Sequence, residues 1–354
     1  MTPLSFVIIG SGWRAMFYAR IAHRYPELFQ LKYMLCRRKE KAEDLKKNQQ
    51  IPTTLSIKEC EGSNPDFVVV AVNKASGFEV TKEWALKGFA VLCETPAGMT
   101  EDQLRELWEL RKQGARIQVA EQYCRYPIMA AGLRKIKEEM REAPYAVTLS
   151  VAHDYHGAGL IRHMLHIGTE PVKIIGKSYR FPVTETASRY GAVTDGSVKE
   201  RERVRFTLEF RSGKTAFYDF SGVQYHSYIR TRYLNVQGKD WEWNDTMFRY
   251  LNEAGEPKEE KLLPYLDKAY RELETEQLQR ESRNWNPVLV LDEAQDEYAI
   301  ASMLLDMKAY LNTGKEVYPL AEALEDAYLW LLMQEALKNP NQILESKQMP
   351  WQQD

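Results

Sequence analysis

The first fifteen residues constrain the fold more than any other part of the sequence. An apolar run, Leu4 to Ile9, leads directly into Gly10-Ser11-Gly12-Trp13-Arg14-Ala15, a GxGxxA turn that opens a helix. The first glycine permits a tight turn, the second lets backbone N–H groups approach a pyrophosphate, and Ala15 allows close packing of helix on strand. The helix N-terminus adds partial positive charge for phosphates. The pattern predicts dinucleotide binding, with Trp13 and Arg14 over the diphosphate; the alternative is a structural turn without a ligand.

The remainder of the N-terminal third repeats this alternation of strand and helix. Short apolar runs are separated by amphipathic helical patterns up to about residue 122. Runs such as Phe67 to Val72 are apolar on both faces, which is typical of a parallel strand covered by helices on either side. Residues 1–122 are therefore predicted to form an α/β domain with a doubly wound parallel sheet of the Rossmann type. Strands are expected at Leu4–Ile9, Leu31–Cys36, Phe67–Val72, Phe89–Cys93 and Ile117–Ala120.

The pattern changes after about residue 145, where apolar and polar residues alternate. Val204 to Phe210 is followed by the turn Ser212-Gly213-Lys214 and then by Ala216 to Phe220, which predicts a hairpin. Residues 123–354 are expected to form an α+β domain with an open mixed or antiparallel sheet, covered by helices on one face. Helical periodicity from about residue 290 to 338 predicts helices that return to the first domain.

Aromatic residues of the predicted second sheet suggest self-association. We expect a homodimer or homotetramer formed through an apolar sheet face that carries Tyr218, Phe220, Tyr225 and Tyr228. A separate segment, residues 253–285, is crowded with Glu and Lys around leucines, which predicts a solvated helix or a lid.

Charge, hydropathy and cysteine content exclude several classes of partner. Lys and Arg number 48 against 50 Asp and Glu, so the chain has no global field that would attract nucleic acid. No apolar run approaches the ~20 residues needed to span a bilayer. The four cysteines lie far apart without a CxxC pair, as expected of reduced thiols in a cytoplasmic protein. A small molecule is the expected partner.

The residues after the second strand indicate which nucleotide is preferred. An Asp or Glu at the end of that strand would hold the ribose 2′-hydroxyl of NAD, but Cys36 stands there. Arg37 and Arg38 follow, and paired guanidinium groups suit a 2′-phosphate. We expect NADP(H) to be preferred and NAD(H) to be possible; the alternative is that these arginines only begin a solvated helix. Asn73, after Val72, is expected either to contact the cofactor or to form a turn.

Three motifs together make the chain resemble the Gfo/Idh/MocA family of NAD(P)-dependent oxidoreductases. The GxGxxA turn is followed by Glu94-Thr95-Pro96 at the end of a strand and later by Arg125-Tyr126-Pro127. In that family the corresponding strand ends in Glu-Lys-Pro, and the order of elements matches over nearly the whole chain. The resemblance implies an oxidoreductase that acts on CH–OH groups of sugars, polyols or related compounds. It places Glu94 and Pro96 at the cofactor.

The resemblance also implies two catalytic positions at which this sequence departs from the family. Thr95 stands where the family has a Lys, so it can hydrogen-bond the substrate without supplying a cation. The family's Asp-x-x-x-His corresponds to Arg162 and His166, of which His166 would be the general base. At this i, i+4 spacing both are expected on one helix face. Arg162 would depress the pKa of His166 and suit an anionic substrate such as an acidic sugar, or else pair with Glu94 or Asp154 for structure.

Four of the six histidines lie in one short segment, at positions His153, His156, His163 and His166. Such a cluster suggests a metal site, but neither an HExxH pattern nor a set of cysteines accompanies it. A site that handles hydroxyl groups also needs neutral imidazoles. We therefore expect no metal, and we expect His153, Tyr155 and His156 to make polar contacts with the substrate.

These observations predict an enzyme that transfers a hydride between nicotinamide and a sugar-like, and under one hypothesis anionic, hydroxy or carbonyl compound. Two alternatives stay open because Thr95 and Arg162 differ from the family pattern. One is a sensor or subunit that binds cofactor or metabolite without turnover. The other is a lyase or hydrolase that keeps its cofactor bound through a transient oxidation.

Overall fold

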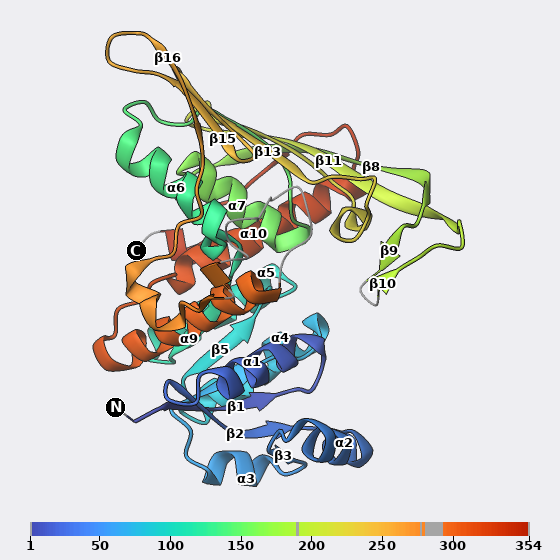
Figure 1. The fold of residues 1–354 in the computed structure, drawn as a ribbon, viewed down its shortest axis with the longest axis vertical. Helices are drawn as coiled ribbons and strands as arrows, with labels where there is room; N and C mark the ends of the chain where they lie inside the picture. Colours follow the sequence, from blue (N-terminus) through green and yellow to red (C-terminus); the bar gives the residue numbers. More distant parts are fainter. Residues whose placement is uncertain (1, 189–190, 277, 280–292, 353–354) are drawn as a thin grey trace. The chain divides into compact units, whose positions relative to one another are not determined.

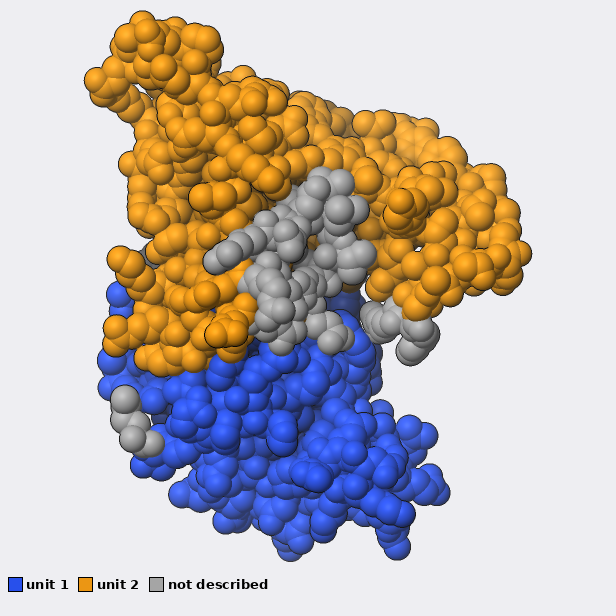
Figure 2. Space-filling model, in the orientation of Figure 1, with its two compact units in different colours: residues 1–122, 297–327, 353–354 blue, residues 123–296, 328–352 orange. Residues whose placement is uncertain are grey.

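The computed structural model describes residues 2–188, 191–276, 278–279 and 293–352 (Figure 1). The chain divides into two compact units, shown in different colours in Figure 2. Unit 1 comprises residues 1–122, 297–327 and 353–354, and unit 2 comprises residues 123–296 and 328–352.

Part of the C-terminal helical region groups with the N-terminal unit. The helices α9 (Glu293–Thr313) and α10 (Leu320–Lys338) each pass from one unit to the other along their length. Residues 290–292 of the predicted helical region lie outside the described residues. In the described part of the chain, no helix is long and apolar enough to cross a membrane.

Among the described residues, unit 1 forms a six-stranded parallel sheet in the order β3-β2-β1-β4-β5-β6. Strands β1 and β4 are buried at every position, as expected of strands with helices on both faces. The predicted Rossmann sheet is confirmed. In this strand order, ligands bind at the carboxyl ends of the strands where the order reverses, beside β1 and β4. The strands are β1 (Leu4–Ile9), β2 (Phe29–Leu35), β3 (Thr53–Thr54), β4 (Phe67–Val70), β5 (Val91–Glu94) and β6 (Ile117–Ala120).

Three of the helices around this sheet begin at residues whose side chains cap them. Ser56, Asn73 and Thr100 each accept a hydrogen bond from a backbone N–H group in the first turn that follows them. These caps fix where the chain turns from the sheet edge into a helix. The helices are α1 (Trp13–Arg24), α2 (Lys39–Gln49), α3 (Ile57–Gly62), α4 (Lys74–Leu86) and α5 (Glu101–Lys112).

In the described part of unit 2, nine strands form a mixed sheet in the order β16-β15-β14-β13-β7-β12-β11-β8-β17. The predicted hairpin is present as β11 and β12, and β12 pairs in parallel with β7. The predicted mixed sheet is confirmed. The strands are β7 (Ala146–Ser150), β8 (Val172–Thr184), β11 (Val198–Phe210), β12 (Thr215–Phe220), β13 (Tyr233–Gln237), β14 (Trp241–Asn244), β15 (Met247–Leu251), β16 (Pro257–Lys261) and β17 (Leu344–Glu345); β9 (Ala187–Ser188) and β10 (Gly191–Ala192) form a separate two-stranded sheet.

Helices α6 (Pro127–Glu139) and α7 (Asp154–Leu165) pack closely on one face of this sheet (Figure 1). A Cβ atom at Gly132 would lie 2.3 Å from the ring of Trp243, and one at Gly157 would lie 2.4 Å from the ring of Tyr218. Glycine is required at both positions because the helix backbone touches an aromatic ring of the sheet.

Two expectations for unit 2 are wrong. The described part of residues 253–285 holds the exposed strand β16 and the 3-10 helix η3 (Lys268–Leu273) where a solvated helix was the favoured expectation. The alternative of a lid stays a prediction, and residues 277 and 280–285 lie outside the described residues. Tyr218 and Phe220 do not lie on an exposed sheet face, since each is 2% exposed. Neighbouring side chains of a strand point to opposite faces, so these two rings face the helices while Phe217 is 46% exposed. Self-association through the open face stays a prediction.

Candidate functional site

The glycine turn after β1 has the shape that a pyrophosphate needs. Gly10 has a φ of 118°, and a Cβ atom there would lie 2.3 Å from the carbonyl oxygen of Ala71, so only glycine fits. At Gly12, the N-cap of α1, a Cβ atom would meet no described atom within 4 Å. The first turn of α1 contains no acidic residue. The space above Gly12 and the start of α1 therefore suit a dianionic diphosphate.

The side chains beside this turn are held in place by aromatic and charged neighbours. The guanidinium carbon of Arg14 lies 5.2 Å from the ring centres of both Trp13 and Phe17. Its Nε atom lies 3.7 Å from Oε2 of Glu94. Ser11 forms a hydrogen bond with the thiol of Cys36, which lowers the pKa of that thiol. Burial has the larger effect, so the pKa of the Cys36 thiol is raised overall. Arg14 is thus anchored in the first turn of α1.

The end of β5 contributes a second group of predicted cofactor contacts. Glu94 accepts a 2.6 Å hydrogen bond from the hydroxyl of Tyr18 on α1. Burial, and next the Glu94 charge, hold the pKa of Tyr18 well above its ordinary value, so the phenol stays protonated. Thr95 is half-buried, Pro96 is buried, and the peptide bond between them is cis. The Tyr18 bond ties this strand end to the helix that follows the glycine turn.

Parallel pairing places the predicted cofactor residues at one sheet edge. Strands β2, β1, β4 and β5 are neighbours in that order, and each ends beside one predicted group. Because their carboxyl ends share an edge, the sheet brings these groups together. They are Arg37 and Arg38 after β2, Gly10 to Arg14 after β1, Asn73 after β4, and Glu94, Thr95 and Pro96 at the end of β5.

Three of these residues show features of both alternatives that the sequence left open. Arg37 and Arg38 are exposed, and Arg38 is the N-cap of α2. Their place after β2 suits a 2′-phosphate, yet they also begin a solvated helix. Asn73 is exposed and its Oδ1 accepts a 3.1 Å hydrogen bond from the backbone N–H of Ser76. Its turn-forming role is therefore observed, and a contact to the cofactor stays a prediction.

In unit 2, polar aromatic side chains gather at the N-terminal end of α7. The hydroxyl of Tyr225 lies 2.5 Å from Nδ1 of His153, accepts a 2.9 Å hydrogen bond from the backbone N–H of His153, and lies 3.2 Å from the hydroxyl of Tyr123. The His156 ring centre lies 4.4 Å from that of Tyr123 and 5.8 Å from that of His153. We call these four residues, Tyr123, His153, His156 and Tyr225, the His–Tyr cluster.

The cluster joins partly accessible rings to buried ones. His153, His156 and Tyr225 are half-buried, whereas Tyr123 is 4% exposed. Tyr155, also predicted to contact substrate, is 1% exposed, with its ring centre 6.1 Å from that of His156. Half-buried imidazoles are suited to hydrogen-bonding and to proton transfer with a hydroxyl compound.

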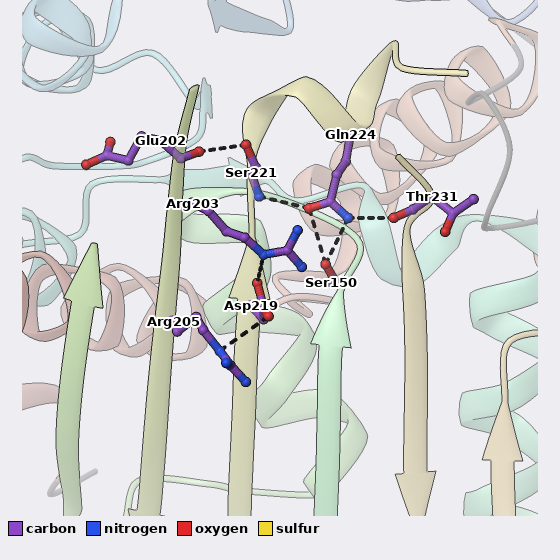
Figure 3. A network of polar contacts seen from close by, with 8 residues as sticks. All are labelled: Ser150, Glu202, Arg203, Arg205, Asp219, Ser221, Gln224 and Thr231. Carbon is purple, nitrogen blue, oxygen red and sulfur yellow. Dashed lines mark hydrogen bonds and ion pairs between the residues drawn. The ribbon is translucent and has the colours of Figure 1, made fainter. Parts of the chain in front are cut away.

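The segment that carries Tyr225 is itself fixed by a network of polar contacts (Figure 3). Gln224, in the 3-10 helix η2 (Gly222–Tyr225), donates through Nε2 to Ser150 Oγ at 3.0 Å and to the carbonyl of Thr231 at 2.6 Å. Its Oε1 accepts from the backbone N–H of Ser221 at 2.8 Å. Gln224 is buried, so these bonds hold η2 against β7 and place Tyr225 beside α7.

The C-terminal end of α7 differs from the sequence-based expectation. The helix ends at Leu165, and His166 is its C-cap in a left-handed conformation with φ 50° and ψ 50°. The expected shared helix face of Arg162 and His166 is therefore wrong. Arg162 is 2% exposed, and its Nε and Nη2 donate to the carbonyl of Gly168 at 3.3 and 3.0 Å. It holds the loop that follows the helix, which is a structural role.

The surroundings of His166 are cationic. Lys214, from the β11–β12 hairpin turn, donates through Nζ to the carbonyls of Leu165 and His166 at 2.6 and 3.4 Å. His166 is an exposed residue whose ring is partly screened from water; this desolvation, followed by Lys214 and then Lys137 and His163, holds the pKa of His166 below its ordinary value. The direction agrees with the predicted neutral base, but its leading causes are desolvation and Lys214 instead of Arg162.

The remaining histidine, His163, contacts the carbonyl of Gly159 one helical turn earlier through Nδ1, at 2.9 Å. The four histidines are thus divided between the two ends of α7. Among the described residues, no group of three or more His, Cys, Asp or Glu side chains is arranged to hold a metal ion.

Sequence reasoning missed Tyr123 and Tyr225 as members of the site. The two residues are separated by 102 positions and meet only because η1 (Tyr123–Arg125) and η2 both lie at the start of α7. A buried cation, Arg232, lies beside them, with its guanidinium carbon 5.8 Å from the ring centre of Tyr225. No short motif marks any of these three residues.

Comparison with known proteins agrees with the fold and with the glycine turn. Residues 4–121 match a family model described as an oxidoreductase family with an NAD-binding Rossmann fold, Gfo/Idh/MocA. None of the curated proteins matches this sequence.

Solved structures share the fold along almost the entire chain. An NAD-binding oxidoreductase from Klebsiella pneumoniae is 13% identical with a TM-score of 0.70, covering 98% of this chain and 100% of that one. A myo-inositol 2-dehydrogenase from Lactobacillus plantarum is 14% identical with a TM-score of 0.68, and the coverage is again 98% and 100%. An oxidoreductase from Agrobacterium radiobacter, solved with NAD+, L-tartaric acid and magnesium, is 12% identical with a TM-score of 0.69, covering 97% and 98%.

The glycine turn, the strand order of unit 1 and the family match over residues 4–121 lead to the same assignment. At these levels of identity the solved structures add the fold of both units. Over residues 4–121, the N-terminal part of this chain therefore matches the Gfo/Idh/MocA family of oxidoreductases with an NAD-binding Rossmann fold.

Proposed function

We propose that this protein is an NADP(H)-preferring oxidoreductase that interconverts a hydroxyl and a carbonyl group on a sugar-like substrate. The observation that carries the proposal is the glycine turn, in which Gly10 is sterically required and the space above Gly12 is open at the start of a helix. Structural neighbours that are dehydrogenases of inositols or of UDP-N-acetylglucosamine support the class of substrate.

Unit 1 would hold the dinucleotide through its sheet edge. The backbone at Gly10, Ser11 and Gly12 and the positive end of α1 would bind the diphosphate. When bound, nicotinamide supplies a hydride acceptor or donor. Glu94 and Arg14 keep their places at the edge through Tyr18 and through each other, so the protein side of the site is organised before a ligand arrives.

Unit 2 would supply the group that moves the proton. Loss of a hydride from a carbinol carbon must be accompanied by loss of the hydroxyl proton, and a neutral imidazole is suited to take it. We assign this role to His153, because its ring is half-buried and is held through Nδ1 by Tyr225. His156 would hydrogen-bond a neighbouring hydroxyl of the substrate. His166 remains the alternative base that the family resemblance implies.

The preference for NADP(H) rests on Arg37 and Arg38. Both are exposed and directly follow β2, where the 2′ position of the adenosine ribose lies in dinucleotide-binding folds. Guanidinium groups form strong, charge-assisted hydrogen bonds with phosphate, so they favour a 2′-phosphate over a 2′-hydroxyl.

A fluorescence titration with NADPH and NADH tests the proposal, with energy transfer from tryptophan to nicotinamide as the readout. We expect NADPH to bind more tightly, and the double variant Arg37→Ser/Arg38→Ser to weaken NADPH binding about ten- to hundredfold while leaving NADH unchanged. Lys46→Ser/Lys47→Ser in the last turn of α2 removes the same charge elsewhere and is the matched control.

The possible results separate the parts of the proposal. Equal affinity for the two nucleotides would contradict the role of the two arginines. Binding of neither nucleotide would show that the glycine turn is only structural and would overturn the proposal. Binding without oxidation or reduction of any sugar, polyol or sugar acid would favour the sensor or subunit that the sequence left open.

We also propose that the protein acts in the cytoplasm as a homo-oligomer associated through the open face of the unit 2 sheet. All four cysteines, which lie in described segments, are free thiols, as expected in a reducing compartment. Phe181 and Phe217 on the open sheet face are 49% and 46% exposed, and an oligomer would cover them. A monomeric mass by light scattering would overturn the second part.

A further inference from the structure

One carboxylate of unit 1, that of Glu94 at the end of β5, is contacted by two residues of a single helix. The hydroxyl of Tyr18 donates to Oε1 of Glu94 at 2.6 Å, and Nε of Arg14 lies 3.7 Å from Oε2. Arg14 and Tyr18 are four residues apart on α1, a spacing that places both side chains on the same helix face. One face of α1 therefore holds both oxygens of this carboxylate.

A pair of aromatic rings on the same helix restricts the direction of the Arg14 side chain. Trp13 and Phe17, also four residues apart, have ring centres 4.7 Å apart in an edge-to-face arrangement. The guanidinium carbon of Arg14 lies 5.2 Å from the centre of each ring. These contacts limit the rotamers open to a long, flexible side chain, which keeps the cation beside Glu94.

Tyr18 meets this carboxylate as a hydrogen-bond donor. Its side chain is fully buried, and burial, followed by the charge of Glu94, holds the pKa of Tyr18 well above its ordinary value. The phenol is therefore protonated near neutral pH. A hydrogen bond to a carboxylate is stronger than one between two neutral groups. Because the Tyr18 ring is enclosed, the packing of α1 sets the direction of this bond and with it the orientation of Glu94.

The place of Glu94 in the sheet indicates which part of a dinucleotide it serves. In a Rossmann fold the diphosphate lies at the start of the first helix, and the adenosine ribose lies at the end of the second strand. The sheet order β2-β1-β4-β5 puts β5 on the opposite side of β1 from β2. The other half of the dinucleotide, which carries nicotinamide, therefore extends over β4 toward the end of β5. The side chain of Glu94 is 14% exposed, so a ligand can reach its carboxylate.

We propose that Tyr18 is a positioning residue that acts through Glu94: together with Arg14, it orients the carboxylate toward the nicotinamide half of the bound dinucleotide. This inference rests on the proposed function for the identity of the ligand. A carboxylate accepts hydrogen bonds, and the nicotinamide half offers ribose hydroxyls and a carboxamide as donors. Tyr18 is enclosed and does not contact the ligand itself. An acceptor that is already oriented loses less freedom on binding, which increases the affinity for the cofactor.

Isothermal titration calorimetry with three ligands tests the inference. They are NADPH, NADH and adenosine 2′,5′-bisphosphate, which lacks the nicotinamide half. Tyr18→Phe deletes the hydroxyl and keeps the ring, and we expect it to weaken binding of NADPH and NADH about tenfold each and of the bisphosphate less than about twofold. The matched control is Tyr33→Phe, since Tyr33 is half-buried on β2 of the same sheet. Equal losses for all three ligands, or no difference from the control, would overturn the inference.

A second set of variants shows whether Tyr18 acts through Glu94. Glu94→Ala removes the carboxylate, and we expect it to weaken binding of both nucleotides at least as much as Tyr18→Phe does. The double variant Tyr18→Phe/Glu94→Ala should bind NADPH no more weakly than Glu94→Ala alone, because the hydroxyl then has no carboxylate to orient. Additive losses would mean that Tyr18 acts independently of Glu94, and they would overturn the inference.

A measurement without nucleotide separates this inference from the proposed function. The charged and titratable groups with assigned effects at Glu94 are Arg14 and Tyr18 from α1 and Cys93 from β5. Loss of the hydrogen bond in Tyr18→Phe should raise the pKa of the Glu94 carboxyl by about one unit. Carbon-13 nuclear magnetic resonance measures this pKa, with Glu94→Gln to identify the resonance.

The outcomes of this measurement are distinct. A raised pKa of Glu94 in Tyr18→Phe, with a wild-type protein that binds neither nucleotide, would support the positioning role of Tyr18 while contradicting the proposed oxidoreductase. Nucleotide binding by the wild-type protein, with a pKa of Glu94 that is the same in Tyr18→Phe as in Tyr33→Phe, would support the proposed cofactor and overturn the inference.

Discussion

At its N-terminal end, α7 lies among hydroxyl groups and imidazoles, and at its C-terminal end it lies among cations and carbonyl oxygens. His153 and His156 contact Tyr225 and Tyr123 at the first end. Arg162 and Lys214 bond backbone carbonyls at the second. The first set presents hydroxyl and imidazole groups that can hydrogen-bond a ligand, whereas the cations of the second neutralise the negative end of the helix dipole. Histidines that are close together in the sequence can therefore lie in two different environments in the fold.

The largest expected effect comes from removing one histidine at each end. His153→Ala should lower kcat by about 10²–10⁴-fold, because an imidazole in contact with the reacting hydroxyl is worth that much. His166→Ala should leave kcat within about twofold. Steady-state kinetics on both variants measure the contrast. A larger loss in His166→Ala would restore the assignment that the family resemblance implies and would break the distinction between the two ends.

The next effect concerns stability and belongs to the C-terminal end. Arg162→Met keeps much of the side-chain volume but removes both bonds to the Gly168 carbonyl, which should cost about 1–3 kcal/mol in the free energy of unfolding. Arg230→Met is the control, because Arg230 is exposed. Urea unfolding followed by fluorescence gives the comparison. If Arg162→Met were as stable as the control but failed to turn over an anionic substrate, Arg162 would be a substrate ligand after all.

The smallest effect is a pH dependence at the same end. The pKa of His166 in the folded protein lies below its ordinary value of 6.5, so below about pH 6.5 the unfolded chain binds more protons than the folded one. The stability that His166 contributes is therefore present above that pH and is lost as pH falls through the lower, folded pKa. His166→Asn should flatten this slope, as seen in urea unfolding between pH 7 and pH 5. An unchanged slope would assign the dependence to other groups.

The sequence predicted unit 1 well because its signals are local. Strands such as Phe67 to Val70 are apolar throughout, and the turn at Gly10 imposes a backbone conformation that only glycine adopts there. Errors in this unit were limited to one or two residues at strand ends and to the short strand β3, whose Thr53–Thr54 leaves little pattern to recognise.

Unit 2 was predicted in outline but not at its site. The alternation of apolar and polar residues identified β11 and β12, but it could not show which face of the sheet the helices cover. Tyr218 and Phe220 were therefore assigned to the open face, although they are buried. A spacing of four residues also suggested one helix face for Arg162 and His166, although the chain leaves the helix between them at Leu165. The contact between Tyr123 and Tyr225 depends on long-range packing, which a single sequence does not encode as a motif.

The close contact of Gly157 with Tyr218 also bears on how this site can change in evolution. Any side chain at residue 157 would push the start of α7 off the sheet. The close packing at Gly157 therefore also fixes the position of His153, which directly precedes this helix. The loop from Gly222 to Arg232 meets no such restriction along its exposed part, where Tyr228 and Ile229 lie in solvent. Under the proposed function, we therefore expect changes of substrate preference to arise in that loop, while the imidazole beside it keeps its place.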